Sequence, residues 1–517
     1  MSYENGVINP ILPGFNPDPN IVKVNNDYFL VVSTFEWMPG LKVYHSKDLI
    51  NWAHITDILT DQVDLKGNPD NCSIWAPQLS YDSGKFYLVY TNVRSTRVPF
   101  KDCHNFLITA SSIYGPWSAP VYMNSSGFDP SLFHDSDGRK WFLNELWDYR
   151  METRNKSCGI VLQEFDEQNN RLIGEVYKIF DGTSLAKTEA PLLYLKNGFY
   201  YLITAEGGTE SGHSVTVCRS RNITGPYSVD PEGVILTASD KPSSPLQCTG
   251  HGSIVEGEFG KWYMVYLCTR PLEGKFGILG RETAIQEVIW TKGGWLRLAN
   301  NTTVPEIETV VVSSKAIVQK RETSFFDDFS QGIQKEWNGR RQIPNDEWCF
   351  ITEDNKLRIV SGESLQSYFC QSILAIRQKD FKYEATTTVD FTPKTFNQMA
   401  GLVIYLNENN YLYCYVTWDE VLGKIVRVMR SQNGEFILEK DKISCPEGSI
   451  TLKFNCDRLQ GQFVVETKDE KIEIGNKQDV SFLSGGFTGT YIGIVVQDLS
   501  CFRGSFADFE YFRYDVK

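Results

Sequence analysis

The stretch Asp18-Pro19-Asn20-Ile21-Val22, followed by Asp27-Tyr28-Phe29-Leu30-Val31, decides the fold because the chain repeats its pattern five times. In each copy a short opening containing Pro or Gly leads into an apolar strand, a turn and an aromatic-rich strand. The later copies open at Ala76-Pro77, Asp129-Pro130, Ala190-Pro191 and His251-Gly252. Two strands joined by a short turn in every copy predict a series of β-hairpins.

The five copies are evenly spaced. Aligned on the residue that opens each copy, they lie 58, 53, 61 and 61 residues apart. A period of this length with two clear strands, and room for two more, is typical of a four-stranded propeller blade. The sequence therefore predicts a five-bladed β-propeller, in which the openings of all five copies meet at the central axis.

A second unit follows the repeats. The pattern stops near residue 300, and strand-like alternation resumes at Phe325-Phe326-Asp327-Asp328-Phe329 and continues towards the C-terminus. Apolar and β-branched runs bounded by Gly and Asn predict a β-sandwich. We therefore expect an all-β chain with a propeller over residues 1–310, a linker over 311–322 and a sandwich over 323–517.

Charge and composition exclude several classes of partner. The 517 residues carry 64 acidic and 51 basic side chains, for a net charge of −13. Nucleic acids and anionic membranes bind basic surfaces, so we expect neither as a partner. The N-terminus lacks a signal-peptide pattern, no apolar stretch is long enough to span a membrane, and the 12 Cys lack metal-ligand spacing. These features predict a cytoplasmic protein with reduced thiols.

Polar side chains open several of the copies and should meet at the axis. Asp18, Asp129 and His251 occupy the same repeat position, while Trp75 and Glu189 stand one residue earlier in theirs. An Asp before Pro is often only a turn residue. Three carboxyl groups at one axis, however, raise one another's pKa and favour a functional site.

Paired carboxyl groups are what glycoside hydrolysis needs. A protonated acid gives a proton to the leaving oxygen, and an ionised carboxylate activates water in an inverting enzyme or attacks the sugar in a retaining one. A third carboxylate can keep the acid protonated. Phe35 and Trp75 can stack on a sugar and Arg281 can bind its hydroxyls, although blade cores and surface ion pairs use the same residue types. His251 can equally be a hydrogen-bonded channel histidine.

The motifs around these residues closely resemble those of glycoside hydrolase family 43 and are nearest to its two-domain β-xylosidases. The resemblance covers essentially the whole chain. Six motifs occur in the family's order: Pro13-Gly14-Phe15-Asn16-Pro17-Asp18-Pro19, Ser33-Thr34-Phe35-Glu36-Trp37, Ile74-Trp75-Ala76-Pro77, Gly127-Phe128-Asp129-Pro130-Ser131-Leu132-Phe133, Lys187-Thr188-Glu189-Ala190-Pro191 and Thr249-Gly250-His251-Gly252.

The resemblance implies a role for each carboxyl group. Asp18 would be the general base, Glu189 the general acid, and Asp129 would orient the acid and tune its pKa in an inverting enzyme. The C-terminal sandwich, a concanavalin-like jelly roll, would close the cleft into a pocket through an aromatic side chain, for which Phe487 is the candidate. Some family members hold a calcium ion near the channel histidine, here His251, and no other cofactor is implied.

We therefore expect an exo-acting enzyme that removes β-1,4-linked D-xylose from the non-reducing ends of xylobiose and xylo-oligosaccharides. An α-L-arabinofuranosidase activity, alone or in addition, stays open because the two sugars present similar hydroxyls. A sugar-binding protein without turnover is a second alternative, and a glycoside phosphorylase, which would need a basic phosphate pocket, is a third. The aromatic-rich sandwich favours a homo-oligomer.

Overall fold

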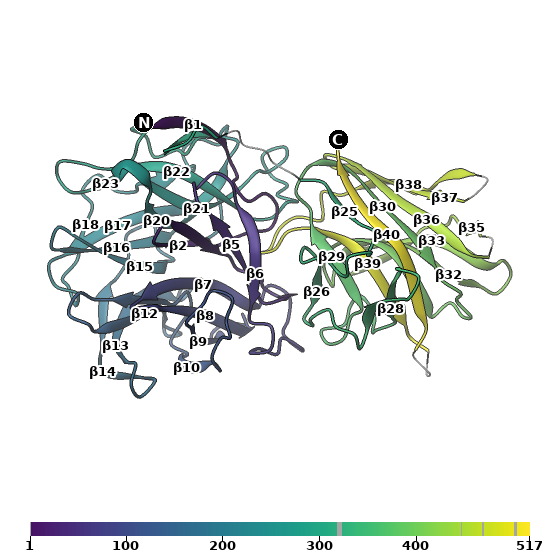
Figure 1. Cartoon of the computed structure of the whole chain (residues 1–517), viewed down its shortest axis with the longest axis horizontal. Helices are drawn as coiled ribbons and strands as arrows, with labels where there is room; N and C mark the ends of the chain where they lie inside the picture. Colours follow the sequence, from purple (N-terminus) through teal and green to yellow (C-terminus); the bar gives the residue numbers. More distant parts are fainter. Residues whose placement is uncertain (1, 318–322, 446, 468–469, 501–503) are drawn as a thin grey trace.

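The computed structural model describes residues 2–317, 323–445, 447–467, 470–500 and 504–517. Figure 1 shows two β-rich bodies, the N-terminal one in purple to teal and the C-terminal one in green to yellow. Within these ranges the only helical element is a 3₁₀ turn, η1 (Glu258–Gly260), and no helix is long and apolar enough to cross a membrane. The predicted all-β class is confirmed.

Five antiparallel sheets form the first body, one for each repeat. Blade I contains β2 (Asn20–Val24), β3 (Asp27–Val31), β5 (Leu41–Ser46) and β6 (Ala53–Ile58). Blade II contains β7 (Ser73–Asp82), β8 (Lys85–Ser95), β9 (Asp102–Ala110) and β10 (Val121–Asn124). Blade III contains β11 (Ser131–His134), β12 (Lys140–Trp147), β13 (Ser157–Asp166) and β14 (Arg171–Phe180). Blade IV contains β15 (Glu189–Lys196), β16 (Phe199–Glu206), β17 (Ser214–Ser220), β18 (Ser228–Val229) and β19 (Leu236–Thr237). Blade V contains β20 (Gln247–Glu256), β21 (Trp262–Thr269), β22 (Glu282–Trp290) and β23 (Leu296–Leu298).

Apolar cores lie between each neighbouring pair of blades and close the ring. The aromatic-rich strand of blade I shows why. Leu30 packs in the core shared with blade V, whereas Phe29 and Val31 pack in the core shared with blade II. Side chains alternate between the two faces of a strand, so a strand buried on both faces reads as a continuous apolar run. The predicted five-bladed propeller is confirmed.

The two ends of the propeller chain are joined by a β-ladder. β1 (Tyr3–Ile8) pairs antiparallel with β24 (Glu308–Ser313), which follows blade V. Val7 and Val311 from these strands are buried in the core between blades V and I. The pairing therefore fixes the first blade against the last. The predicted boundaries at 310 and 323 stay predictions, and residues 318–322 of the expected linker lie outside the described residues.

The second body is the predicted β-sandwich, whose two sheets enclose one large apolar core. One sheet contains β25 (Phe325–Asp327), β27 (Cys349–Ile351), β28 (Leu357–Val360), β30 (Lys382–Asp390), β36 (Ser449–Asp457), β37 (Gln460–Glu466), β38 (Lys471–Asp479) and β40 (Phe506–Val516). The other contains β26 (Asn338–Arg340), β29 (Ile373–Arg377), β31 (Gln398–Asn407), β32 (Asn410–Asp419), β33 (Gly423–Gln432), β34 (Glu435–Leu438), β35 (Ile443–Ser444) and β39 (Tyr491–Asp498).

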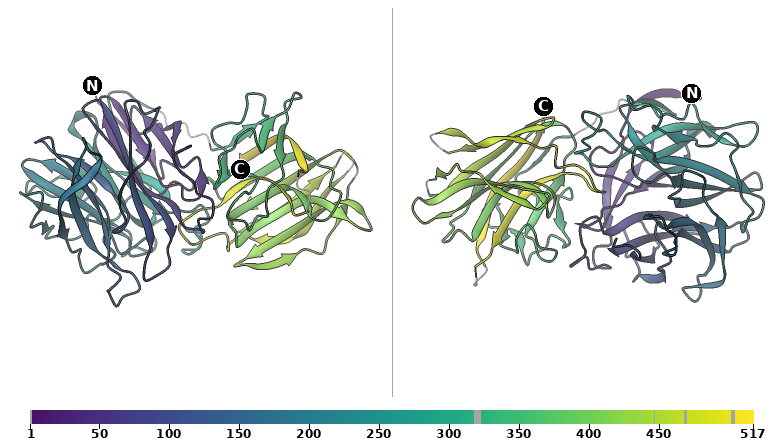
Figure 2. Two further views of the ribbon diagram at one scale, coloured as in Figure 1. Left: turned by 90° about the horizontal axis from the view of Figure 1, so that it is seen from below. Right: turned by 180° about the vertical axis from the view of Figure 1, so that it is seen from behind.

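The second sheet extends into the propeller. β4 (Trp37–Met38), from the loop between β3 and β5 of blade I, pairs with β26 at the end of that sheet. The Trp37 ring stacks on Tyr491 with 3.8 Å between ring centroids. Figure 2 shows yellow segments of the sandwich reaching the propeller in both views. The two bodies are thus joined by backbone pairing as well as by side-chain packing.

A buried ion network crosses the same interface. Arg340 lies 3.1 Å from Glu36 of the propeller and 3.1 Å from Glu408 of the sandwich, and Arg341 also pairs with Glu408. Arg341 donates to the Asn68 carbonyl at 2.6 Å, which ties it to the propeller. All four charged side chains are at most 2% exposed. Buried charges of this kind need their partners, so the network holds one arrangement of the two bodies.

Candidate active site

One cavity at the propeller axis contains every residue that the sequence singled out for a site. Its volume is about 150 Å³. The predicted residues that line it are Asp18, Phe35, Trp75, Asp129, Glu189, His251, Arg281 and Phe487. Seven come from the propeller, and Phe487 comes from the loop before β39 of the sandwich. The expected convergence of the repeat openings is therefore observed.

The backbone at the repeat openings turns these side chains towards the axis. Asp18, Ala76, Asp129, Ala190 and His251 all have a positive φ, between 38° and 55°. Left-handed backbone is uncommon outside glycine, and here it recurs at the opening position of every blade. In blades II, IV and V the strand register shifts at the opening itself. Such irregularities re-aim side chains, which explains how a shared repeat position becomes a shared site.

Asp18 is held as an anion by three neighbours. Arg281 Nη1 lies 2.7 Å from Asp18 Oδ1, and Ser33 Oγ donates to Asp18 Oδ2 at 2.6 Å. His251 Nδ1 lies 3.6 Å from the same carboxylate. Burial opposes ionisation, but Arg281 and then His251 and Ser33 hold the pKa of Asp18 below its ordinary value. Asp18 is therefore ionised at neutral pH.

Glu189 and Asp129 are in the opposite situation. Burial is the largest cause that raises the pKa of Glu189 to about 7, and the charge of Asp18 adds to it, although Lys101 lowers it. Burial, followed by the charges of Glu189 and Asp18, also raises the pKa of Asp129 well above its ordinary value. Two carboxyl groups that interact this closely titrate as a pair. The pair keeps a proton near neutral pH while Asp18 does not.

Aromatic rings form one wall of the cavity. Phe487 lies 5.5 Å from Trp75 and 6.1 Å from Phe35 between ring centroids, so the sandwich ring completes a cluster begun by the propeller. Arg281 Nε donates to the Phe487 carbonyl at 2.9 Å, and the Phe487 N–H donates to Asn71 Oδ1 at 2.7 Å. The loop that carries Phe487 is thus fixed to the propeller through both the N–H and the carbonyl of that residue.

The sequence interpretation missed several lining residues. Phe128 stands one residue before Asp129, the repeat position of Trp75 and Glu189, so the repeat alignment contained the signal for it. Lys101 lies 4.2 Å from the centroids of Phe128 and Trp147, and no repeat signal marks it. The other missed lining residues are Asn155, Lys187, Gly208, Thr209 and Glu210.

A Gly-rich loop over 207–212 joins β16 to β17, and its Gly208, Thr209 and Glu210 line the cavity. Lys187, close to Glu189 in sequence, lies 3.7 Å from Glu210. The backbone of Gly207 and Gly208 has a positive φ of 81° and 72°, which suits glycine at a tight turn. The loop therefore contributes to the rim of the site.

The surroundings of His251 do not fit a calcium ion. Calcium takes six to eight oxygen ligands, mainly carboxylates and carbonyls. The nearest carboxylate, Asp18, is already paired with Arg281. Within the described ranges no group of three or more His, Cys, Asp or Glu side chains is arranged to hold a metal ion.

Comparison with known proteins agrees with this architecture. Residues 7–296 match Glycosyl hydrolases family 43, and residues 326–515 match the β-xylosidase C-terminal concanavalin A-like domain. The chain is 42% identical to xylosidase/arabinosidase 43B of Humicola insolens, covering 98% of this chain and 97% of that protein. It is 40% identical to a β-xylosidase of Bacillus subtilis (strain 168), covering 99% of this chain and 100% of the relative.

A solved structure gives the same result. The crystal structure of xylan β-1,4-xylosidase from Bacillus halodurans C-125 superposes with a TM-score of 0.95 at 43% identity, covering 98% of this chain and 100% of that one. Both domains and their mutual arrangement are therefore shared with a solved relative. The chain belongs to glycosyl hydrolase family 43.

Proposed function

We propose that this family 43 glycosidase is an exo-acting, inverting enzyme that removes β-1,4-linked D-xylose from the non-reducing ends of xylobiose and xylo-oligosaccharides. The observation that carries the proposal is the opposed state of two carboxyl groups in one cavity: the pKa of Asp18 is lowered and that of Glu189 is raised to about 7. Two carboxyl groups whose pKa values are shifted in opposite directions are typical of an acid and a base acting together.

In the proposed reaction Glu189 is the general acid and Asp18 the general base. Glu189 gives its proton to the glycosidic oxygen as the bond to the anomeric carbon breaks. Asp18 takes a proton from a water molecule whose oxygen bonds to the opposite face of that carbon. Asp129, which titrates together with Glu189, orients the acid and tunes its pKa. An inverting mechanism needs the two carboxyl groups about 6.5–9.5 Å apart, with room for the water.

The exo action follows from the shape of the site. Phe487 covers the cavity from the sandwich side, and the cavity volume of about 150 Å³ suits a single sugar unit rather than the interior of a chain. The rings of Phe35 and Trp75 offer flat apolar faces to that sugar. The sugar on the leaving-group side would then lie at the open rim of the cavity.

Hydrolysis of 4-nitrophenyl β-D-xylopyranoside by the wild type and by Asp18→Ala tests the proposal. We expect turnover by the wild type and its loss in the variant, since no other group would activate the water. Products followed by ¹H NMR should begin as α-xylose if the configuration inverts. Absence of turnover by the wild type on xylosides, with tight xylobiose binding, would instead favour a sugar-binding protein.

An α-L-arabinofuranosidase activity is the second candidate, because the Humicola insolens relative carries both activities in its name. Parallel assays with 4-nitrophenyl α-L-arabinofuranoside give the ratio of kcat/KM for the two sugars. A ratio that favours the arabinoside would reverse the order of the two candidates. Sugar 1-phosphate formed in phosphate buffer would identify a phosphorylase.

Self-association is the further part of the proposal. β34 ends the order of the second sandwich sheet, and its Phe436, Ile437 and Leu438 are 56%, 40% and 38% exposed. An apolar strand at a sheet edge is a ready surface for a second copy. Light scattering after size exclusion should show an oligomer for the wild type and a smaller species for Phe436→Lys. The cytoplasmic location stays a prediction.

A further inference from the structure

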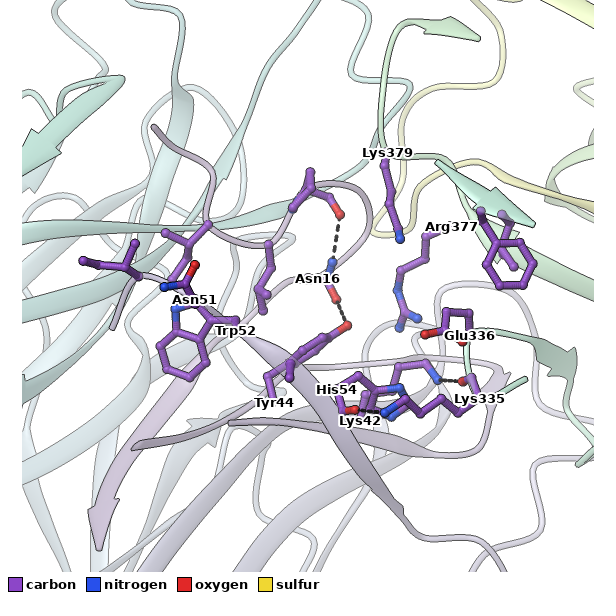
Figure 3. A pocket seen from close by; sticks show the side chains of 17 residues that line it. Asn16, Lys42, Tyr44, Asn51, Trp52, His54, Lys335, Glu336, Arg377 and Lys379 are labelled. Carbon is purple, nitrogen blue, oxygen red and sulfur yellow. Dashed lines mark hydrogen bonds between the residues drawn. The ribbon is translucent and has the colours of Figure 1, made fainter. Parts of the chain in front are cut away.

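A second and larger cavity lies between the propeller and the sandwich. Its volume is about 400 Å³, and it shares no lining residue with the cavity at the axis. The propeller contributes the N-terminal segment around Asn16 and the β5–β6 region with Tyr44 and Trp52. The sandwich contributes Lys335, Glu336 and the end of β29 with Arg377 and Lys379 (Figure 3). Cavities of this size at domain interfaces commonly hold small molecules.

The cavity is basic, although the chain as a whole is acidic. Its described lining includes the basic side chains of Lys42, Lys335, Arg377 and Lys379 against the single carboxylate of Glu336. Figure 3 shows that Arg377 and Lys379 extend from the sandwich towards Asn16 and Tyr44 of the propeller. A concave site with one dominant sign of charge concentrates ligands of the opposite sign.

Arg377 is the strongest indication of a ligand. Its side chain is 5% exposed, Nε donates to the Phe15 carbonyl at 2.5 Å and Nη1 to Asn338 Oδ1 at 3.5 Å. In the described part of the chain its Nη2 is buried without a hydrogen-bond partner, and neither of the two hydrogen bonds is to a carboxylate. A buried guanidinium without an anion is costly, even with the Tyr491 ring 5.6 Å away.

Lys42 supports the same conclusion. It is 2% exposed, donates to the Lys335 carbonyl at 3.0 Å and lies 3.5 Å from Asp57. Asp57 is shared with His54, which lies 2.7 Å from the same carboxylate oxygen. Burial lowers the pKa of Lys42 to about 8, and the charge of Arg377 acts in the same direction. An anion in the cavity would offset the positive charges of both Lys42 and Arg377.

We propose that this interdomain cavity binds a sugar-sized anion, whose carboxylate or phosphate is held by Arg377 and Lys42. Arg can bind either group with two parallel hydrogen bonds. The volume exceeds what a bare inorganic ion needs, and Trp52 and Tyr44 supply aromatic faces for a ring. The Asn51 and Asn16 amides, which also line the cavity, suit the hydroxyls of such a ring.

Isothermal titration on the full-length chain tests the proposal, with D-glucuronate, D-glucose 6-phosphate, inorganic phosphate and uncharged D-glucose as the probes. We expect one-to-one binding of at least one sugar anion and none of D-glucose. Preference between the two sugar anions identifies the headgroup. If inorganic phosphate binds as tightly as both sugar anions, the claim that the ligand is sugar-sized is wrong. If no anion binds at millimolar concentration, the claim that the cavity is an anion site is wrong.

Variants locate the binding. Arg377→Gln and Lys42→Gln should each weaken it at least tenfold. Asn51→Asp, which adds a carboxylate at an exposed position of the cavity lining, should also weaken it and keeps the test valid if the buried basic residues are needed for folding. Lys471→Gln, an exposed lysine of the sandwich, is the matched control and should bind normally. Asp18→Ala should also bind normally, because its cavity is separate. Loss of binding in Asp18→Ala would place the anion in the active site and overturn the inference, whatever the fate of the proposed hydrolysis.

Discussion

Replacing Glu189 by Gln tests the proposed division of labour between the carboxyl groups. The amide keeps the size of the side chain but cannot deliver the proton. Xylobiose has a poor leaving group that needs this proton, whereas 4-nitrophenolate leaves without it. General acid catalysis typically contributes about 10²- to 10⁴-fold. We therefore expect kcat/KM for xylobiose to fall about 10²- to 10⁴-fold. The fall for 4-nitrophenyl β-D-xylopyranoside should be much smaller.

The pH profile gives the same prediction a second readout. The pKa of Glu189 is raised to about 7, so its protonated fraction falls about tenfold for each pH unit above that value. Wild-type kcat/KM on xylobiose should fall at the same rate on the alkaline side. On the acid side, activity should persist until pH approaches the lowered pKa of Asp18. In Glu189→Gln the alkaline decline should disappear.

Two results would refute this reasoning. An equal loss on xylobiose and on the aryl xyloside would show that Glu189 does not protonate the leaving oxygen. An unchanged alkaline decline in the variant would assign that titration to another group. Glu232→Gln is a suitable control, because Glu232 is an exposed carboxyl that pairs with Arg297 away from both cavities. Circular dichroism and the melting temperature confirm that the variants fold.

Three further predictions follow from other contacts. Lys101→Met should move the alkaline limb of the kcat/KM profile to higher pH, because the Lys101 charge lowers the pKa of Glu189; an unmoved limb contradicts this. Phe487→Ala removes two ring contacts of about 0.5–1.5 kcal/mol each, so the free energy of unfolding in urea should fall by about 1–3 kcal/mol. The KM for xylobiose should rise because the sugar loses its cover, and Phe326→Ala on the sandwich surface should leave the KM unchanged. Arg340→Met leaves the buried Glu36 carboxylate without an ion-pair partner and should cost about 3–5 kcal/mol in urea unfolding. A cost below about 1 kcal/mol would show that the interface network is dispensable.

The repeat is the reason that so much of the site could be predicted. Asp18, Asp129 and His251 share a repeat position and a positive φ. Aligning the copies was therefore enough to predict that their side chains meet at the axis. The same alignment contained Phe128 beside Asp129. Phe487 was different, because only the resemblance to a known family connected the sandwich loop with the propeller axis.

Residues outside the repeat could not be found in this way. Lys101 lies between β8 and β9, and Glu210 in the loop between β16 and β17, where chain course depends on packing rather than on a period. The network of Glu36, Arg340 and Glu408 depends on how two domains meet, and nothing in the local sequence of either side specifies that geometry. Periodicity predicts what the blades repeat; connections and interfaces follow from tertiary contacts.

Arg281 explains why the site needs both domains. Its Nη1 pairs with Asp18 at 2.7 Å, and its Nε donates to the Phe487 carbonyl at 2.9 Å. The guanidinium is rigid and planar, so the direction that suits the carboxylate also fixes where the carbonyl must lie. The side chain that favours the ionised base therefore also holds the ring that covers the sugar. The docking of the sandwich and the ionised state of Asp18 are thereby linked through one residue of blade V.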